Sequence, residues 1–278
     1  MPISLSLKPA IVEFQIKPGS SFTQAYQVTN LGSHPEIITP SVHPWINSST
    51  STPQYISDQI YPGFTFSLAN ADVKLDSAFR LEPSQSRQLV LKVSASPFLA
   101  PSDGYFTLFL STESYQSNSN TSPVSARIGS HLLLSTNTET ISPVPPQITS
   151  FKVTSSFIDA FFTPINFVGT ATNNTPHFTK VQGNIHIVKS GKTISALKLA
   201  PDNVLAKSTR PLHCLDTHYA PVPCQLTPPF WPGLYQVKVQ NITQNFYVWP
   251  LSPLILLTLI LTTIVVITKV LVIFRSGH

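Results

Sequence analysis

Short runs in which hydrophobic and polar residues alternate follow one another along most of the chain, and turn residues separate them. An alternation with a period of two is typical of strands that are buried on one face. In the first half, the segment Lys17-Pro18-Gly19-Ser20 is one of the separating turns. We expect strands there at 3–7, 11–16, 22–30, 36–42, 64–68, 87–94, 105–112 and 131–136. About eight short strands are typical of an immunoglobulin-like β-sandwich.

A second, smaller set of alternating runs follows the segment 140–146 (TISPVPP), which predicts a stiff linker because neighbouring prolines favour an extended chain. We expect these strands at 148–154, 165–173, 183–188, 193–199, 235–239 and 245–248. The predicted fold class is therefore all-β, with two immunoglobulin-like β-sandwich domains in tandem followed by one C-terminal transmembrane helix. The predicted boundaries are 1–139 and 147–249 for the sandwiches, 250–274 for the helix and 275–278 for a short basic cytoplasmic tail.

The helix is predicted from residues 251–268, 18 residues without a charge. At 1.5 Å per residue they span roughly 27 Å, close to the hydrocarbon thickness of a bilayer. Tyr247 and Trp249 precede this segment, and Lys269 and Arg275 follow it, so we interpret the four as membrane-interface anchors. A buried core helix is the alternative interpretation. Membrane lipid is thus an expected partner through residues 250–274.

The orientation of the predicted helix follows from charge. No Lys or Arg lies between Lys238 and Lys269, whereas the C-terminal tail is basic. The positive-inside rule therefore predicts a cytoplasmic C-terminus and N-terminal domains outside a plasma membrane. The start, MPISLSLKPAIVEF, lacks the features of a signal peptide. Two interpretations stay open: the start lies further upstream, or the protein is tail-anchored and faces the cytosol.

Composition narrows the class of protein and of partner. Only 10% of the residues are charged while 42% are hydrophobic, which argues against a disordered chain, and 26 prolines argue against a helical bundle. The net charge of +5 is uneven, because residues 1–145 carry 7 Lys/Arg against 9 Asp/Glu and residues 146–278 carry 10 against 3. These basic residues are dispersed, which disfavours nucleic acid and fits an anionic surface near a membrane. The candidates for contact with lipid head groups or envelope polymers are Lys180, Lys189, Lys192, Lys198, Lys207, Arg210 and Lys238. An ordinary solvated face is the alternative for this set.

Two cysteines, Cys214 and Cys224, lie close together in the sequence HCLDTHYAPVPC. A disulfide between them would stabilise the fold by about 2.8 kcal/mol on the chain-entropy model, and it would suit an exported domain. Two free thiols are the alternative. His213 and His218 flank the pair, but the spacing matches no standard zinc pattern.

We find no catalytic motif: there is no G-x-S-x-G, H-E-x-x-H, P-loop or G-x-G-x-x-G sequence. We therefore expect no enzyme activity, no catalytic residue, no cofactor and no metal site. His186 alternates with isoleucines, which predicts a position on the outer face of a strand. Trp45 and Trp231 are either sandwich core or an exposed platform for a ligand.

The segments LSLKPAIVEFQIKPGSSFTQAYQVTNLG, FSLANADVKLDSAFRLEPSQSRQLVLKVSASP and DGYFTLFLST share a recognisable order of strands and turns. Over residues 3–112 this order resembles the N-terminal domain of the WxL-interacting cell-surface proteins of Gram-positive bacteria. More broadly, it resembles PapD-like and major-sperm-protein-like sandwiches. The first resemblance implies two immunoglobulin-like domains, one C-terminal transmembrane helix and a role in peptidoglycan attachment, without identifying ligand-contact residues.

Taken together, these features predict a non-enzymatic single-pass membrane protein that displays two β-sandwich domains at the cell surface. The expected role is envelope attachment, adhesion or protein binding, with a cell-envelope polymer or a protein as partner and no nucleic acid. The alternative is a tail-anchored, cytosol-facing adaptor with a major-sperm-protein-like head.

Overall fold

The computed structural model describes residues 4–47, 53–56, 63–113, 125–136, 144–154, 158–159, 164–227, 230–249 and 253–276. Most of the predicted linker, residues 140–143, lies outside these ranges, as do residues 277–278 of the predicted tail. The chain divides into two compact units. Unit 1 consists of residues 1–144 with the short segments 174–178 and 205–208, and unit 2 consists of residues 145–173, 179–204 and 209–278.

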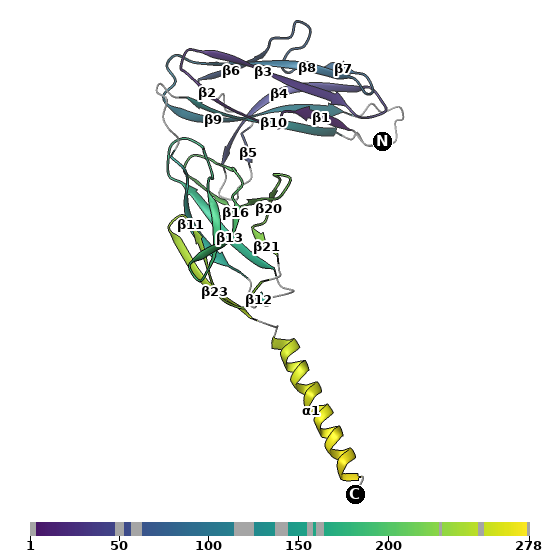
Figure 1. Cartoon of the computed structure of the whole chain (residues 1–278). Coiled ribbons are helices and arrows are strands. Elements are labelled where there is room, and N and C mark those ends of the chain that lie inside the picture. The colour runs from purple at the N-terminus through teal and green to yellow at the C-terminus, as the bar shows by residue number, and fades with distance from the viewer. Residues whose placement is uncertain are drawn as a thin grey trace. The chain divides into compact units, whose positions relative to one another are not determined.

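Unit 1 contains two main sheets, which Figure 1 shows as two layers. The strand order of the first is β1-β3-β8-β6, and that of the second is β2-β10-β9-β4-β5, with β7 also paired to β4. All pairs are antiparallel except β2 with β10. The bounds are β1 Leu5–Lys8, β2 Ile11–Ile16, β3 Ser21–Asn30, β4 Glu36–Asn47, β5 Pro53–Tyr55, β6 Phe64–Leu68, β7 Phe79–Leu81, β8 Ser86–Ala95, β9 Ser102–Glu113 and β10 Ser125–Thr136.

The core of unit 1 lies between these sheets, because alternate residues of each point inward. Leu89 and Leu91 of β8 and Leu108 and Leu110 of β9 are all fully buried. Each such side chain stabilises the fold by about 1.5–3 kcal/mol relative to exposure. Burial also raises the pKa of Tyr26 to about 12.

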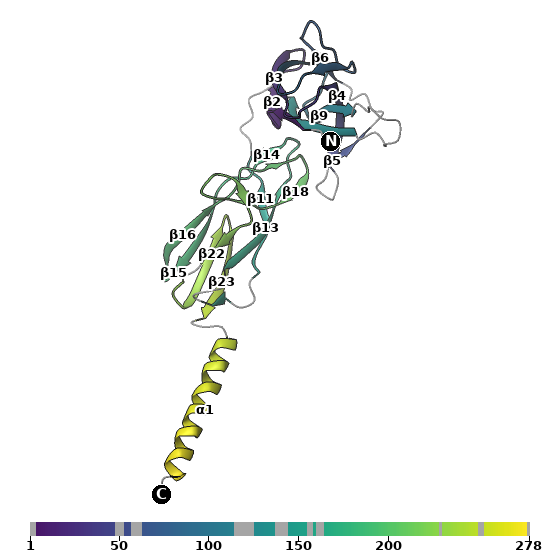
Figure 2. The same cartoon turned by 90° about the vertical axis from the view of Figure 1, so that its right-hand side faces the viewer.

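Unit 2 also contains two main sheets, and Figure 2 shows β15, β16, β22 and β23 of the larger one side by side. The larger sheet has the order β12-β23-β22-β15-β16, and the smaller has the order β11-β13-β18 with β21 also paired to β13. Two short pairs, β14-β17 and β19-β20, complete the described strands. The bounds are β11 Gln147–Val153, β12 Ile158–Asp159, β13 Ile165–Asn173, β14 Thr179–Lys180, β15 Asn184–Lys189, β16 Lys192–Lys198, β17 Asn203–Val204, β18 Ser208–Pro211, β19 Cys214–Leu215, β20 Pro221–Val222, β21 Gln225–Leu226, β22 Gly233–Val239 and β23 Ile242–Trp249.

One α-helix, α1 (Pro253–Ser276), follows β23. Side chains in this helix are described for residues 257–269. Taken over the described residues alone, no helix is long and apolar enough to cross a membrane. The observed bounds differ from the predicted 250–274, and the helix begins at a proline because the first turn of a helix needs no amide donor there.

The prediction of an all-β fold is confirmed for both units. Several strands are longer than predicted, and β4 is an example, since it was expected to end at Val42 and continues through Pro44. Proline lacks an amide donor but still accepts hydrogen bonds, and the Pro44 carbonyl accepts one from the Ile56 amide at 3.1 Å. The short strands β5, β7, β12, β14 and β17 to β21 were not predicted, because two to four residues are too few to show a period.

Candidate functional site

The outer face of the β22–β23 hairpin in unit 2 carries large apolar side chains that are about half exposed. In β22 and β23 alternate residues point inward, among them the buried Tyr235 and Val248. The residues between them point outward, and Leu234, Tyr247 and Trp249 are 59%, 47% and 48% exposed. Leu234 lies opposite Tyr247 in the strand register, and the Tyr247 and Trp249 ring centroids are 4.9 Å apart.

Trp231 lies two residues before β22 and is 81% exposed. Its backbone carbonyl accepts hydrogen bonds from the Tyr235 hydroxyl at 2.5 Å and from Lys189 Nζ at 3.1 Å. These bonds fix the backbone while the indole stays in solvent. Trp231 is therefore held in place by hydrogen bonds to its backbone and not by packing of its ring.

Lys189 and Lys192 belong to the neighbouring hairpin, in which Ser190 and Gly191 form the turn between β15 and β16. Lys189 Nζ also donates to the Pro232 carbonyl at 3.0 Å and lies 5.0 Å from the centroid of the Tyr235 ring. Lys192 is opposite Lys189 in the register, and its side chain is exposed. Two lysines thus lie at the same end of the sheet as Trp231.

The other five predicted basic residues do not join this pair. Lys198 pairs with Asn184 and Lys238 pairs with His186, which places both toward the opposite end of the sheet. Arg210 of β18 donates to the Asn203 carbonyl at 2.8 Å. Lys180 lies on β14, and Lys207 lies in unit 1, where its ammonium donates to the Asn174 carbonyl. The seven residues therefore form no single basic face; His186, as expected, is exposed on β15.

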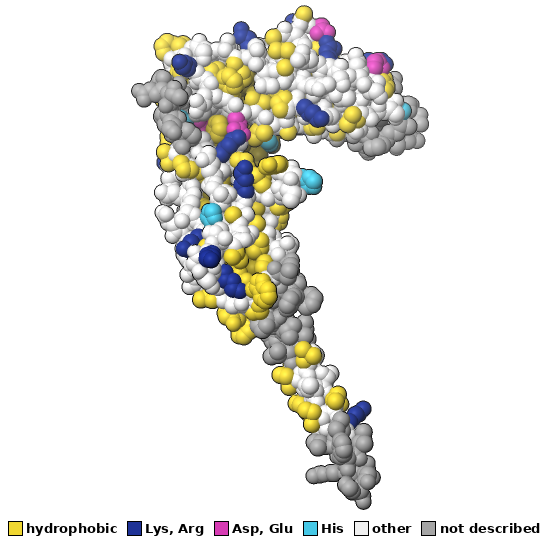
Figure 3. Space-filling model, in the orientation of Figure 1, with side chains coloured by type: hydrophobic (Ala, Val, Ile, Leu, Met, Phe, Trp, Pro, Cys, Tyr) yellow, Lys and Arg dark blue, Asp and Glu magenta, His cyan; other side chains and the backbone are white. Residues whose placement is uncertain are grey.

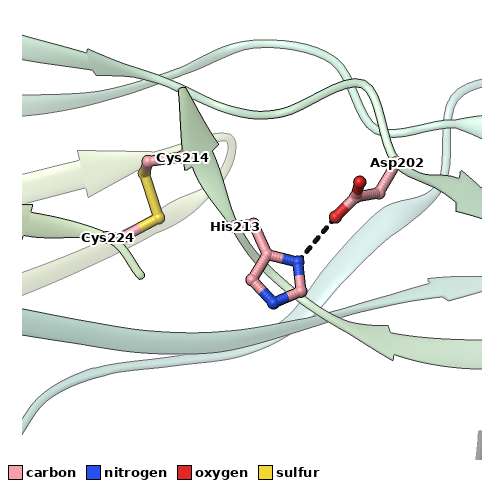
Figure 4. Close-up of a disulfide and its surroundings, with 4 residues drawn as sticks. All are labelled: Asp202, His213, Cys214 and Cys224. Carbon is pink, nitrogen blue, oxygen red and sulfur yellow. Dashed lines mark hydrogen bonds and ion pairs between the residues drawn. A yellow bond between two sulfur atoms is a disulfide. The ribbon is translucent and has the colours of Figure 1, made fainter. Parts of the chain in front are cut away.

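A disulfide joins Cys214 and Cys224, both of which are 2% exposed (Figure 4). Beside it, His213 Nδ1 donates to Asp202 Oδ2 at 2.6 Å, whereas His218 is exposed. Among the described residues no three His, Cys, Asp or Glu side chains form a group that could hold a metal ion. The disulfide between Cys214 and Cys224 stabilises the loops of unit 2 and leaves neither cysteine as a reactive thiolate.

The remaining predicted anchors, Lys269 and Arg275, lie in α1. Lys269 is exposed, and the side chain of Arg275 is outside the described residues.

Unit 1 contains an aromatic cluster on the outer face of its second sheet, which the sequence did not indicate as a group. Trp45 of β4 is only 5% exposed and stacks on Tyr105 of β9, with ring centroids 5.1 Å apart. Leu133 of β10 completes the buried set, and Phe178 and Leu205 from the two short segments of unit 1 pack against it. Of the two alternatives for Trp45, the structure has the buried one.

Polar groups next to this cluster are also largely buried. His131 Nδ1 and Thr107 Oγ1 are 2.9 Å apart, and burial lowers the pKa of His131 below its ordinary value. The Asp103 carboxylate accepts hydrogen bonds from the Tyr105 hydroxyl at 3.0 Å, from His177 Nδ1 at 2.9 Å and from the Phe178 amide. Such satisfied networks fix a fold, because each donor has a defined partner.

Sequence reasoning missed Leu234 and the pairing of Lys189 with Lys192 as parts of one surface. The signal was present in GLYQVKV, where an apolar residue alternates with buried aromatic and aliphatic ones and so must face outward. Which strand lies beside β22 cannot be read from a local pattern, so the position of the lysines needed the sheet order.

No family model matches the chain, and no curated protein matches it. Among solved structures, the chain is similar to the E. coli chaperone DraB, at 16% identity over 88% of this chain and 97% of that one, with a TM-score of 0.41. It is also similar to a Salmonella enterica SafA pilin in complex with the SafB chaperone, at 13% identity over 89% and 98%, with a TM-score of 0.42. A third is the CsuC-CsuE chaperone-tip adhesion subunit complex of Acinetobacter baumannii, at 11% identity over 88% and 98%, with a TM-score of 0.39. These identities and TM-scores are too low to assign a role to any residue of this chain, so the chemistry of the site is described from the chain's own contacts.

Proposed function

We propose that the protein is a non-enzymatic single-pass membrane protein whose two β-sandwich units are displayed outside the cell for envelope attachment, adhesion or protein binding. The observation that carries this proposal is the uncharged run 251–268 of the sequence, of which residues 253–268 lie in the 24-residue helix α1. At 1.5 Å per residue the helix is roughly 36 Å long, and a bilayer core is about 30 Å thick.

The described side chains of α1 support a lipid environment. Large aliphatic residues between Leu257 and Ile267 are 48% to 59% exposed and lie on all sides of the helix. A helix that is apolar all round is typical of a membrane span or of the interior of a large protein. Thr262, Thr263 and Thr268 satisfy their hydroxyls by donating to carbonyls three or four residues back, which suits an apolar solvent.

Two features support an extracytoplasmic position for the sandwiches. Lys269 and Arg275 follow the uncharged run, whereas no Lys or Arg precedes it as far back as Lys238, which favours a cytoplasmic C-terminus. The disulfide between Cys214 and Cys224 suits an oxidising compartment.

A binding role fits what the described strands offer. β1 and β6 are the edges of the first sheet of unit 1, and an edge strand can pair with an extended segment of another protein. An envelope polymer is the other partner that the sequence resemblance implies. A protein partner would bind through backbone hydrogen bonds at an edge strand, whereas a polymer would not need them.

Membrane fractionation of the full chain tests the proposed anchor. The double variant Leu261→Arg, Val265→Arg should leave the membrane fraction, because each arginine at the centre of a span costs about 2.5–3.5 kcal/mol. The matched control Leu261→Ile, Val265→Leu keeps the apolar character and should stay in the membrane after an alkaline wash. Retention of the arginine variant would overturn the anchor.

Protease treatment of intact cells tests the topology. If the units are displayed outside, external protease removes residues 1–248 and leaves a short membrane-bound fragment. If these residues are protected until the cells are permeabilised, the protein is instead a tail-anchored adaptor that faces the cytosol.

A further inference from the structure

We infer that the end of unit 2 from which α1 continues is itself a membrane-contact surface, which places Trp231, Leu234, Tyr247 and Trp249 in the headgroup zone of the bilayer and Lys192 against lipid phosphate. This inference rests on the proposed function of α1 as a membrane anchor. It adds a docking surface to that anchor.

The strand register brings these side chains to one end of one sheet. Gly233 pairs with Val248 and Leu234 with Tyr247, so the beginning of β22 lies beside the end of β23. Trp231 lies two residues before β22, and Trp249 is the last residue of β23. The apolar side chains therefore meet where the chain leaves the sheet for α1.

The length of the connection keeps this end close to the helix. Trp249 is four residues before Pro253, the first residue of α1. Four extended residues span at most roughly 14 Å. Since a headgroup region is several ångströms deep on each side of the hydrocarbon core, any arrangement of the connection leaves this end of the sheet near the membrane surface.

The chemistry of the exposed side chains fits that zone. Tryptophan and tyrosine concentrate at membrane interfaces because they combine an apolar ring with a polar group. Trp231 is 81% exposed although its backbone carbonyl is held by two hydrogen bonds, so an ordered main chain presents the indole outward. Trp45 of unit 1, at 5% exposure, shows the contrasting fate of a tryptophan that packs into the fold.

The charges at this end favour a phospholipid surface over a purely apolar partner. Lys189 and Lys192 are opposite each other in the β15–β16 register, and like charges so placed repel. An anionic phosphate beside them relieves this repulsion. Among the acidic residues of unit 2, the Asp202 carboxylate already accepts a hydrogen bond from His213 Nδ1. Figure 3 shows hydrophobic and Lys/Arg side chains together on the visible face of this part of unit 2.

Tryptophan fluorescence of the full chain in lipid nanodiscs tests the inference, because the chain has only three tryptophans. In the variant Trp45→Phe, Trp249→Phe the emission comes from Trp231 alone. We expect this emission to be blue-shifted in nanodiscs of phosphatidylcholine and phosphatidylglycerol and to lose intensity when the acyl chains are brominated near the headgroup. Quenching by aqueous iodide should fall correspondingly.

The outcomes separate the docking surface from the anchor. If the protein co-elutes with the nanodiscs but Trp231 stays open to iodide and insensitive to brominated lipid, the docking surface is wrong and the anchor stands. If the protein does not co-elute, the anchor fails, and the inference fails with it.

Two further variants, which make the same change of charge at different places, test the proposed contact of Lys192 with lipid phosphate. In the single-tryptophan background, Lys192→Glu should reduce the quenching of Trp231 by brominated lipid, since a carboxylate repels phosphate. Lys238→Glu makes the same change of charge on the same sheet, but toward its opposite end, and should leave the quenching unchanged. Equal effects of the two variants would show that net charge, and not this end of unit 2, sets the contact.

Discussion

The outer faces of two sheets, one in each unit, carry aromatic side chains of the same kinds. These side chains are buried in unit 1 and exposed in unit 2. In unit 1 the outward residues of β9 are buried, including Tyr105, Thr107 and Phe109, so the central strand is covered on both faces. In unit 2 the outward residues of β22 and β23, including Leu234 and Tyr247, stay exposed. The same alternating pattern thus gives a second layer of core in one unit and an open apolar surface in the other.

The difference lies in what packs on top of each face. In unit 1, Trp45 from the neighbouring strand, Phe178 and Leu205 lie over the sheet and exclude water. On the outer face of the β22–β23 hairpin no comparable covering cluster is found among the described residues. The exposure of a large aromatic residue at the end of the strand that precedes α1 therefore carries information that its presence in the sequence does not.

The largest expected difference between the two faces is the effect of replacing one tryptophan in each unit. Trp45→Ala removes a buried ring and should destabilise unit 1 by about 3–5 kcal/mol. Trp231→Ala removes an exposed ring and should change stability by no more than about 0.5 kcal/mol. Urea titration of the full chain in detergent micelles, with hydrogen exchange of β9 and β22 peptides, gives both values.

A third variant serves as the control for that pair. Trp45 Nε1 is buried without a hydrogen-bond partner among the described residues, so Trp45→Phe deletes a costly unsatisfied donor together with part of the ring. It should cost much less than Trp45→Ala. Equal losses for Trp45→Ala and Trp231→Ala would contradict the distinction between the two faces.

Removing the disulfide should weaken unit 2 alone, because the two cysteines of the chain both lie there. The variant Cys214→Ser, Cys224→Ser should lose about 2–4 kcal/mol of stability. Hydrogen exchange should accelerate in β13 and β22 peptides and stay unchanged in β8 and β9 peptides. A reducing agent should reproduce this result in the native chain and have no effect on the variant, and faster exchange in unit 1 would contradict the assignment.

The sequence predicted the long strands well because each of them buries one face and so shows a period of two. β6 and β13 have the predicted bounds, Phe64–Leu68 and Ile165–Asn173. The outer cluster of unit 1 could not be predicted, since Phe178 and Leu205 come from segments distant in sequence and carry no local pattern. The positions of the basic residues relative to one another could not be predicted for the same reason, because a local pattern does not show which strands are neighbours.

A small increase in side-chain size should destabilise the covered face moderately and the open face hardly at all. Gly129 of β10 lies on the covered face, and a Cβ there would meet Thr107 Cγ2 at 2.7 Å and the Phe109 ring at 3.0 Å. Gly129→Ala should therefore destabilise unit 1 by about 1–3 kcal/mol. Ala196→Val also adds bulk, but on an exposed position of β16, and should be nearly neutral. Thermal unfolding of both variants measures the difference, and a neutral Gly129→Ala would mean that the covering layer yields easily.

The smallest expected effect is a dependence of the stability of unit 1 on pH through His131. Burial lowers the pKa of this residue from its ordinary 6.5, so the folded state takes up the proton at a lower pH than the unfolded state does. Between these two pKa values the unfolded state binds more protons, and stability rises with pH. The stability that the neutral imidazole contributes is therefore fully present above pH 6.5 and is lost as the pH falls toward the pKa of the folded state.

The variant His131→Gln isolates this effect, because glutamine keeps a hydrogen-bonding group near Thr107 Oγ1 and does not titrate. The free energy of unfolding of unit 1, followed by hydrogen exchange of β9 and β10 peptides, should fall less steeply in the variant when the pH is lowered below 6.5. His218→Gln, which replaces an exposed histidine of unit 2, controls for the loss of a histidine as such. If both variants keep the native slope, the outer face of β10 is open to water, and the contrast between the two sheet faces does not hold at this position.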